Sequence, residues 1–203
     1  MAVIQGRLGE LWIGSGAGTT TGVKAACELV STKRYHVTDA AKRYLDPEFD
    51  ILVYDNNVLV TSGYTIEGGC HIVFAATPTT PVTVTAKYLT PAEVIYVQNW
   101  TLDLQSDTYE ITSLGDTSKK FMGSGLLSWS GSFERFYEDS TWEAKAISTS
   151  RLVGRFFTNQ PGGLCWTGWI APNSWTVNLP LELATENFGF TGVGKPVYSI
   201  DET

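Results

Sequence analysis

The stretch SGLLSWSGSFERFY, residues 124–137, predicts a long strand with two unlike sides. Side chains alternate across a strand, so every second residue lies on the same face. The apolar face consists of Leu127, Trp129, Phe133 and Tyr137, and the polar face of Ser124, Ser128, Ser130, Ser132 and Glu134. One face is therefore expected to be buried and the other to meet water.

Two further segments show the same alternation. NWTLDLQ, residues 99–105, has Trp100, Leu102 and Leu104 on one side and Asn99, Thr101, Asp103 and Gln105 on the other. In SWTVNLPLEL, residues 174–183, the shared apolar side consists of Trp175, Val177, Leu179, Leu181 and Leu183. Long alternating segments of this kind predict a sandwich or a section of a barrel.

One helix is expected within this half of the chain. DSTWEAKAIS begins with a capping box, in which the Ser140 hydroxyl can accept from a helix N–H and Glu143 reaches back. We place the helix at about residues 141–148. The fold class is thus mainly β, a β-sandwich or barrel segment with one flanking α-helix.

Composition limits the function classes. The chain has 203 residues, of which 43% are hydrophobic and 17% charged, which is typical of a globular protein with one or two β domains. The net charge of −7 argues against wrapping nucleic acid, because that requires clustered Lys and Arg. The start of the chain has no signal-peptide pattern and no apolar run reaches membrane-spanning length, so we expect a soluble protein with no membrane partner.

The sequence of the first half of the chain predicts shorter β-strands. Strands are expected at LGELWI and VKAACELV, residues 8–13 and 23–30, and the glycine-rich segment between them, residues 14–22, is expected to be a mobile loop. TDAAKRYLDP predicts one or two helical turns capped by Thr38 or Asp39. Residues 49–88 predict strands joined by tight turns that contain Asn and Gly.

Enzyme chemistry has little support. His36 and His71 fall on different predicted elements, and neighbouring Cys70 and His71 would point to opposite faces of a strand. The cysteines Cys27, Cys70 and Cys165 are too widely spaced for a metal motif, and we read them as free thiols in a reducing cytoplasm. The acidic side chains Glu134, Glu138 and Asp139 are expected to be solvated. No catalytic residue, metal or cofactor is predicted.

The polar strand faces have two readings. An antiparallel sheet commonly turns one side to solvent, and that reading needs no function. The other reading is a wall of a water-filled lumen formed when subunits close into a ring. A separate alternative is a soluble β-sandwich that binds carbohydrate or protein through exposed Trp166 or Trp169.

The order of segments in the second half resembles a known family. TYEITSLGDTSKKFMGSGLLSWSGSFERFYED is followed by TWEAKAIS, RLVGRFFT and GWIAPNSWTVNLPLELATENFGFTGVGKPVY. The most telling parts are the polar loop before the S-G-S strand and the closing aromatic strand with FTGVGKP. Over roughly residues 102–198, about half the chain, this order resembles the major tail tube proteins of long, non-contractile-tailed bacteriophages.

The resemblance implies a structural virion protein. Six copies would form a ring whose sheets join into a continuous inner β-barrel, and stacked rings would conduct DNA during ejection. It implies assembly in the host cytoplasm, residence in the virion tail, and tape measure, tail terminator and tail tip proteins as partners. Genomic DNA would pass through without specific binding.

The resemblance also assigns residues. The lumen candidates are Asn99, Thr101, Asp103, Gln105, Ser128, Ser130, Ser132 and Glu134, which offer small polar or acidic groups that do not attract phosphate. The ring-stacking loop candidates are Gly115, Asp116, Thr117, Ser118, Lys119, Lys120 and Phe121. We expect residues 14–22 and 114–123 to be mobile in the monomer and ordered in the tube.

The first half departs from the family pattern. We expect one tail-tube-type domain over residues 1–203, with an N-terminal strand and flexible arm at 1–33 and a ring-forming core at 91–203. Residues 34–90 are expected to be a β-rich elaboration of that core.

Overall fold

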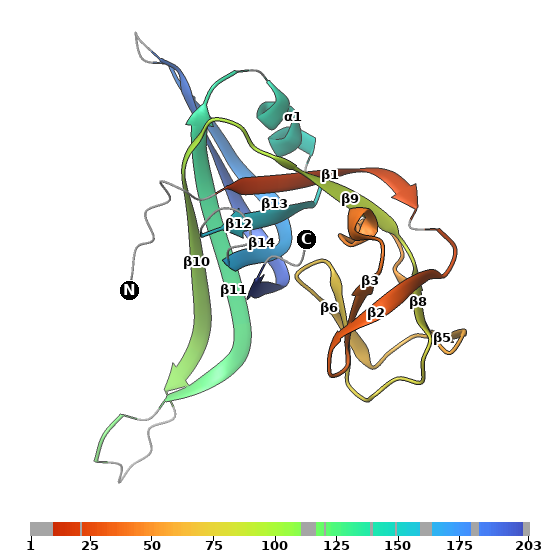
Figure 1. The fold of residues 1–203 in the computed structure, drawn as a ribbon. Helices are drawn as coiled ribbons and strands as arrows, with labels where there is room; N and C mark the ends of the chain where they lie inside the picture. Colours follow the sequence, from red (N-terminus) through yellow and green to blue (C-terminus); the bar gives the residue numbers. More distant parts are fainter. Residues whose placement is uncertain are drawn as a thin grey trace.

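The computed structural model describes residues 10–20, 22–110, 117–119, 121–138, 140–148, 150–158, 164–179 and 183–200. The predicted fold class is confirmed: within these residues the protein is mainly β, with one α-helix and one 3-10 helix. The strands form two seven-stranded sheets that lie side by side, each with its own apolar core (Figure 1).

The first sheet, here called the long-strand sheet, contains the longest strands. Its members are β1 (Leu11–Thr20), β9 (Lys87–Glu93), β10 (Val97–Glu110), β11 (Phe121–Phe136), β12 (Leu152–Phe157), β13 (Leu164–Asn178) and β14 (Thr185–Ile200). In space they follow the order β10-β11-β14-β13-β12-β1-β9, and all neighbours are antiparallel. The sheet curls, so that its two ends face different directions (Figure 1).

Aromatic rings fill the concave side of this sheet. Phe133 stacks on Phe188 and Phe156 stacks on Phe190, each pair with ring centroids 5.1 Å apart. The helix α1 (Thr141–Ser148) lies where the sequence predicts it and covers one end of this core. Its buried Trp142 meets Phe133 and Phe188 edge-on, an arrangement that aromatic pairs favour.

The second sheet, here called the inserted sheet, lies in the chain between β1 and β9. Its members are β2 (Ala25–Ser31), β3 (Arg34–Val37), β4 (Leu52–Asp55), β5 (Val58–Val60), β6 (Tyr64–Glu67), β7 (His71–Phe74) and β8 (Val82–Thr85). The spatial order is β5-β4-β8-β2-β3-β7-β6. β1 and β9 pair with each other as neighbouring antiparallel strands. The inserted sheet is therefore an insertion in the connection between these two strands.

Turn residues occur where the sequence predicts them. Asn56 and Asn57 have φ values of 44° and 65° between β4 and β5, which Asn tolerates better than most residues. The short helix η1 (Ala40–Lys42) is capped by Asp39, whose carboxylate accepts from the Ala41 amide at 3.1 Å. Of the two cap candidates, Asp39 is therefore the one used.

The two sheets are joined by specific contacts. Trp169 of β13 packs against the core of the inserted sheet and donates its indole N–H to the Leu45 carbonyl at 2.8 Å. The Gly68 amide donates to the Lys195 carbonyl at 2.9 Å. The Glu67 carboxylate lies between Arg34 at 2.8 Å and Lys195 at 2.9 Å. These contacts hold the inserted sheet against β13 and β14.

The expectation of a loop over residues 14–22 is wrong for residues 14–20, whereas their mobility in the monomer stays a prediction. They belong to β1, which extends to Thr20 and pairs with β9, with a register shift between Ser15 and Thr19. Backbone hydrogen bonds to β9 offset the poor strand propensity of glycine. Residue 21 lies outside the described residues.

Four apolar residues do not lie in the core, contrary to the alternation. Leu127 and Tyr137 are 42% and 37% exposed, although Trp129 and Phe133 between them are buried. Leu179 and Leu183 are 73% and 53% exposed, because β13 ends at Asn178. Tyr137 lies just beyond the end of β11, and Leu127 lies in the part of β11 that pairs with β10 but not with β14. Leu181 lies outside the described residues.

Among the described residues, no helix has the length and apolar character needed to span a membrane.

Candidate functional site

Four long strands of the long-strand sheet carry a polar face. The eight residues singled out in the sequence form four directly opposed pairs between β10 and β11. The pairs are Asn99 with Glu134, Thr101 with Ser132, Asp103 with Ser130, and Gln105 with Ser128. Both strands thus present their polar sides to the same face, because the register aligns the two alternations. We call this surface the polar ladder.

Hydrogen bonds run along the polar ladder. Asn99 donates its amide to a Glu134 carboxylate oxygen at 3.0 Å, and Gln105 donates to Asp103 at 2.9 Å. The hydroxyls of Thr101 and Ser132 lie 3.1 Å apart. In both amide–carboxylate contacts the donor is neutral, so the contact holds the carboxylate against the sheet without cancelling its charge.

The polar ladder continues onto β14 and β13. Asn187 lies opposite Glu134, and Thr191 lies opposite Ser130. On β13, Thr176 lies opposite Asn187, and the Asn173 amide donates to the Thr191 hydroxyl at 2.9 Å. The alternation in SWTVN indicated the polar side of β13, but no sequence signal showed that β14 joins it to β11.

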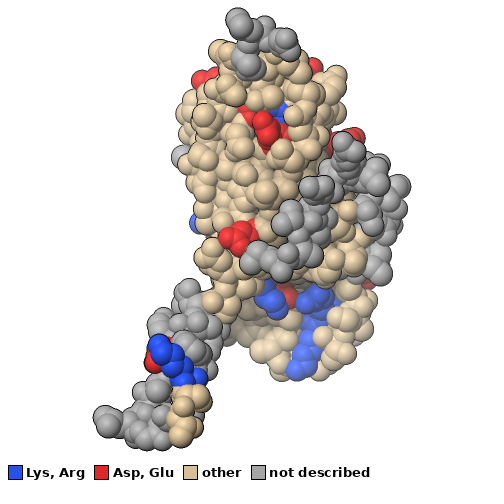
Figure 2. Space-filling model, turned by 90° about the vertical axis from the view of Figure 1, so that its left-hand side faces the viewer, with Lys and Arg blue, Asp and Glu red and all other residues tan. Residues whose placement is uncertain are grey.

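The polar ladder carries few charges. Its acidic members are Asp103 and Glu134, and the residues named above include no Lys or Arg. Figure 2 shows the side of the molecule that lies on the left in Figure 1, where β10 and β11 are found, and most of its upper part is uncharged with scattered acidic groups. Lys and Arg gather lower in that view, away from the uncharged upper part. A surface of this kind attracts phosphate weakly.

The four strands β10, β11, β14 and β13, here called the four-strand unit, have one edge that lacks a strand partner within the described residues and one that lacks it over part of its length. β10 pairs with β11 only. β13 pairs with β12 from Cys165 to Ile170, but residues 171–178 pair with β14 alone. Unpaired strand edges present rows of N–H and C=O groups that can accept another strand.

The proposed stacking loop lies at the tip of the β10–β11 hairpin. Thr117, Ser118 and Lys119 are exposed, and Lys119 makes an ion pair with Glu110 at 3.2 Å. Phe121 is the first residue of β11. Gly115, Asp116 and Lys120 lie outside the described residues.

The helix cap is described only in part. The Ser140 carbonyl accepts from the Ala144 amide at 3.1 Å, the first hydrogen bond of α1. The capping roles of the Ser140 hydroxyl and of Glu143 stay predictions.

The seven tryptophans, all of them in described residues, are buried or half-buried. The expectation that Trp166 or Trp169 is exposed is therefore wrong. Trp166 stacks on Tyr198 with ring centroids 4.5 Å apart, and Trp169 fills the junction of the two sheets. Neither ring forms an open platform for a sugar.

The two histidines come together in the inserted sheet. The rings of His36 and His71 stack with centroids 5.9 Å apart, which their separate elements did not predict. The Cys70 sulfur lies 3.1 Å from His71 Nδ1, so these side chains do not diverge as expected. The reason is that Cys70 precedes β7 in a turn with positive-φ glycines, where strand alternation does not hold.

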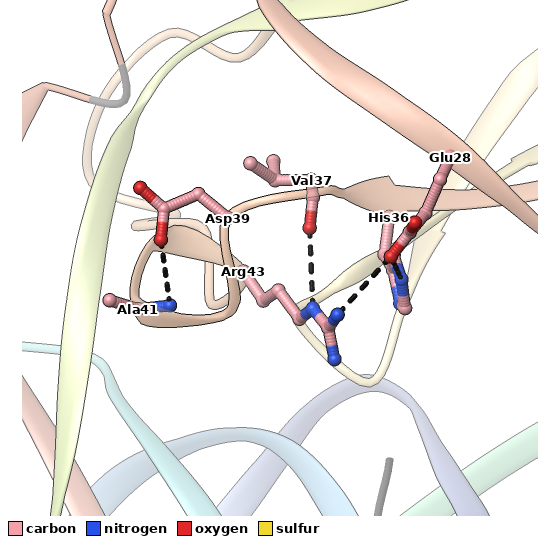
Figure 3. A network of polar contacts seen from close by, with 6 residues as sticks. All are labelled: Glu28, His36, Val37, Asp39, Ala41 and Arg43. Carbon is pink, nitrogen blue, oxygen red and sulfur yellow. Dashed lines mark hydrogen bonds and ion pairs between the residues drawn. The ribbon is translucent and has the colours of Figure 1, made fainter. Parts of the chain in front are cut away.

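A polar network surrounds His36 (Figure 3). Its Nε2 lies 2.7 Å from a Glu28 carboxylate oxygen, which also accepts from Arg43 at 3.2 Å. Arg43 donates in addition to the Val37 carbonyl at 3.2 Å. Burial lowers the pKa of His71 to about 4, with a further decrease from Arg34. Within the described part of the chain, no group of His, Cys, Asp and Glu has the arrangement of a metal site.

No protein-family model and no curated protein matches this chain. Among solved structures, similar chains occur in gene transfer agent particles. One is in the tail of an empty particle with C6 symmetry: identity is 12%, the match covers 54% of this chain and 87% of that one, and the TM-score is 0.48. Another is in the virion of a native particle, with 14% identity, 54% and 88% coverage, and a TM-score of 0.46.

Proposed function

We propose that this protein is a structural subunit of a phage-type tail tube. Six copies form a ring, the rings stack, and the polar ladders line the channel through which DNA passes. The protein acts by assembly and carries out no reaction. Its partners are further copies of itself and the tail terminator, tape measure and tail tip proteins. Its location is the virion.

The observation that carries this proposal is the four-strand unit with two open edge segments in its described residues, the outer side of β10 and residues 171–178 of β13. Strand direction alternates through β10, β11, β14 and β13, so the two edge strands run in opposite directions. If the ring axis runs roughly parallel to the strands, rotation about that axis leaves the direction of each strand unchanged. β13 of one copy would therefore meet β10 of the next as an antiparallel pair, which is the geometry that a closed barrel needs.

The chemistry of the polar ladder supports a conduit. Hydroxyl and amide groups keep the surface wet, and the fixed carboxylates of Asp103 and Glu134 would repel phosphate along the whole wall. Clustered Lys or Arg would instead hold the DNA in place. The sequence resemblance over residues 102–198 supports the same function.

Native mass spectrometry and negative-stain electron microscopy test the proposal. We expect particles of six times the 22.2 kDa chain mass and hollow filaments at higher concentration. In assembled material, alternate amides of β10 and of residues 171–178 should become protected from hydrogen exchange. Residues 130–136 of β11 are the internal control, since they are paired on both sides already. Monomers at all concentrations, or unchanged exchange in β10, would refute the proposal.

A further inference from the structure

A buried ion pair lies at one end of the four-strand unit. Arg135 of β11 and Glu186 of β14 are directly opposite each other in the sheet, and the Arg135 guanidinium donates to a Glu186 carboxylate oxygen. Their exposed fractions are 4% and 1%. The guanidinium also lies 5.8 Å from the ring centroid of Trp142 on α1. The pair therefore belongs to the core side of the sheet, opposite the polar ladder.

The same carboxylate binds a residue of a third strand. The indole N–H of Trp175 on β13 donates to the second Glu186 oxygen at 2.8 Å. Each oxygen of Glu186 thus accepts from a different neighbour of β14, one from β11 and one from β13. We call Arg135, Glu186 and Trp175 the buried triad. It connects three of the four strands, because its members lie on β11, β14 and β13.

Stability alone is a poor explanation for the buried triad. The desolvation of two charges costs about as much free energy as their attraction returns, so apolar side chains of similar size often stabilise a fold as well. A buried pair does fix the positions of its partners, since moving one of them leaves the other without compensation. The triad is therefore suited to hold the part of β13 that carries Trp175.

That part of β13 has little other support. Residues 171–178 pair with β14 alone, whereas residues 165–170 pair with β12 as well. Pro172 has no N–H to donate, and the register with β14 shifts between Pro172 and Ser174. Segments with few backbone partners open more readily than the rest of a fold. Trp175 follows this irregularity directly, so its bond to Glu186 holds the segment where the pairing is interrupted.

We propose that Glu186 is a positioning residue for ring assembly. By binding Trp175, it keeps residues 171–178 in the strand conformation that pairs with β10 of the next copy. A segment that is ordered beforehand loses less conformational entropy when it pairs, so rings form at a lower protein concentration. Arg135 compensates the charge of Glu186 inside the core. This inference rests on the proposed function, and it adds the residues that prepare one of the two open edge segments.

Trp175→Phe tests this role, because it removes the indole N–H and keeps an aromatic ring. In monomers, the amides of residues 174–178 should exchange at least about tenfold faster relative to residues 130–136 of β11, since a hydrogen bond to a charged group is lost. The fraction of rings at one fixed concentration, measured by native mass spectrometry, should also fall. The matched control is Trp166→Phe on the same strand, whose ring stacks on Tyr198. The control should equal the wild type in both measurements.

A second variant removes both charges together. Arg135→Met with Glu186→Leu should stay folded by circular dichroism, because apolar side chains replace the whole pair. It should nevertheless show the fast exchange and the ring deficit of Trp175→Phe, since Trp175 has lost its acceptor. Wild-type exchange in residues 174–178, or wild-type ring formation, in either variant would overturn this inference. A wild-type protein that forms no rings would instead overturn the proposed function.

Discussion

Trp129 shows how single residues separate the core from the polar ladder. Its indole lies across Gly192 and Gly168, and an added Cβ at Gly192 would overlap the ring. The indole N–H is satisfied by the Gly194 carbonyl at 2.9 Å. The neighbouring strands therefore have glycine at the positions that the large Trp129 ring covers. As a result the aromatic side of β11 stays inside while its serines face out.

His71 is the residue whose charge should affect folding. Burial lowers its pKa from 6.5 to about 4 in the folded state, so the unfolded chain binds a proton more readily. Its contribution to stability is complete above about pH 6.5 and is lost as pH falls toward 4, by up to about 3 kcal/mol. We expect His71→Gln to lack this part of the acid sensitivity. Urea unfolding of both proteins from pH 7.5 to pH 4 measures it, and parallel curves would contradict it.

At the scale of elements, α1 depends on its contacts more than on its own sequence. A helix of eight residues is too short to be stable alone. Trp142 fixes it to the core, and the Lys145 ammonium lies 4.0 Å from the indole centroid. The remaining local determinant is the predicted cap at its first turn.

Replacing the cap residue tests that prediction. Ser140→Ala should lower the free energy of unfolding by about 1 kcal/mol, because a helix N–H would lose its acceptor. Ser140→Asp keeps an acceptor and should behave like the wild type. The urea midpoint of each variant gives the result, and equal midpoints for Ala and Asp would show that the hydroxyl is not a cap.

At the scale of the molecule, the inserted sheet is an addition to a sheet that is complete without it. The core of the long-strand sheet contains no residue between 22 and 86. β1 and β9 pair across the insertion, and Thr20 lies opposite Lys87. The main loss on removing the insertion would be the cover of Trp169.

A deletion tests this independence. Replacing residues 21–86 with Asn-Gly, a turn that suits two adjacent antiparallel strands, should leave a folded protein that still forms rings. Trp169→Lys is included to avoid an exposed indole. Circular dichroism and native mass spectrometry report folding and assembly, and a chain that unfolds or aggregates would show that the two sheets stabilise each other.

The polar ladder shows which features side-chain alternation in the sequence can predict and which it cannot. It placed the polar residues of β10 and β11 on common strand sides, and the register then aligned all eight. It did not indicate that β14 lies between β11 and β13, because strand order depends on contacts between residues far apart in the chain. It also placed Leu127, Tyr137, Leu179 and Leu183 with the core, because alternation does not show where a covering layer ends.

The sequence by itself determined the mainly β class, the position of α1 and which sides of β10, β11 and β13 are polar. These features depend on neighbours along the chain, through side-chain alternation and capping. Only the tertiary structure decided that residues 14–20 form a strand, that His36 stacks on His71, and that the inserted sheet interrupts one hairpin. These features depend on partners distant in the chain, whose backbone hydrogen bonds and packing outweigh local preference.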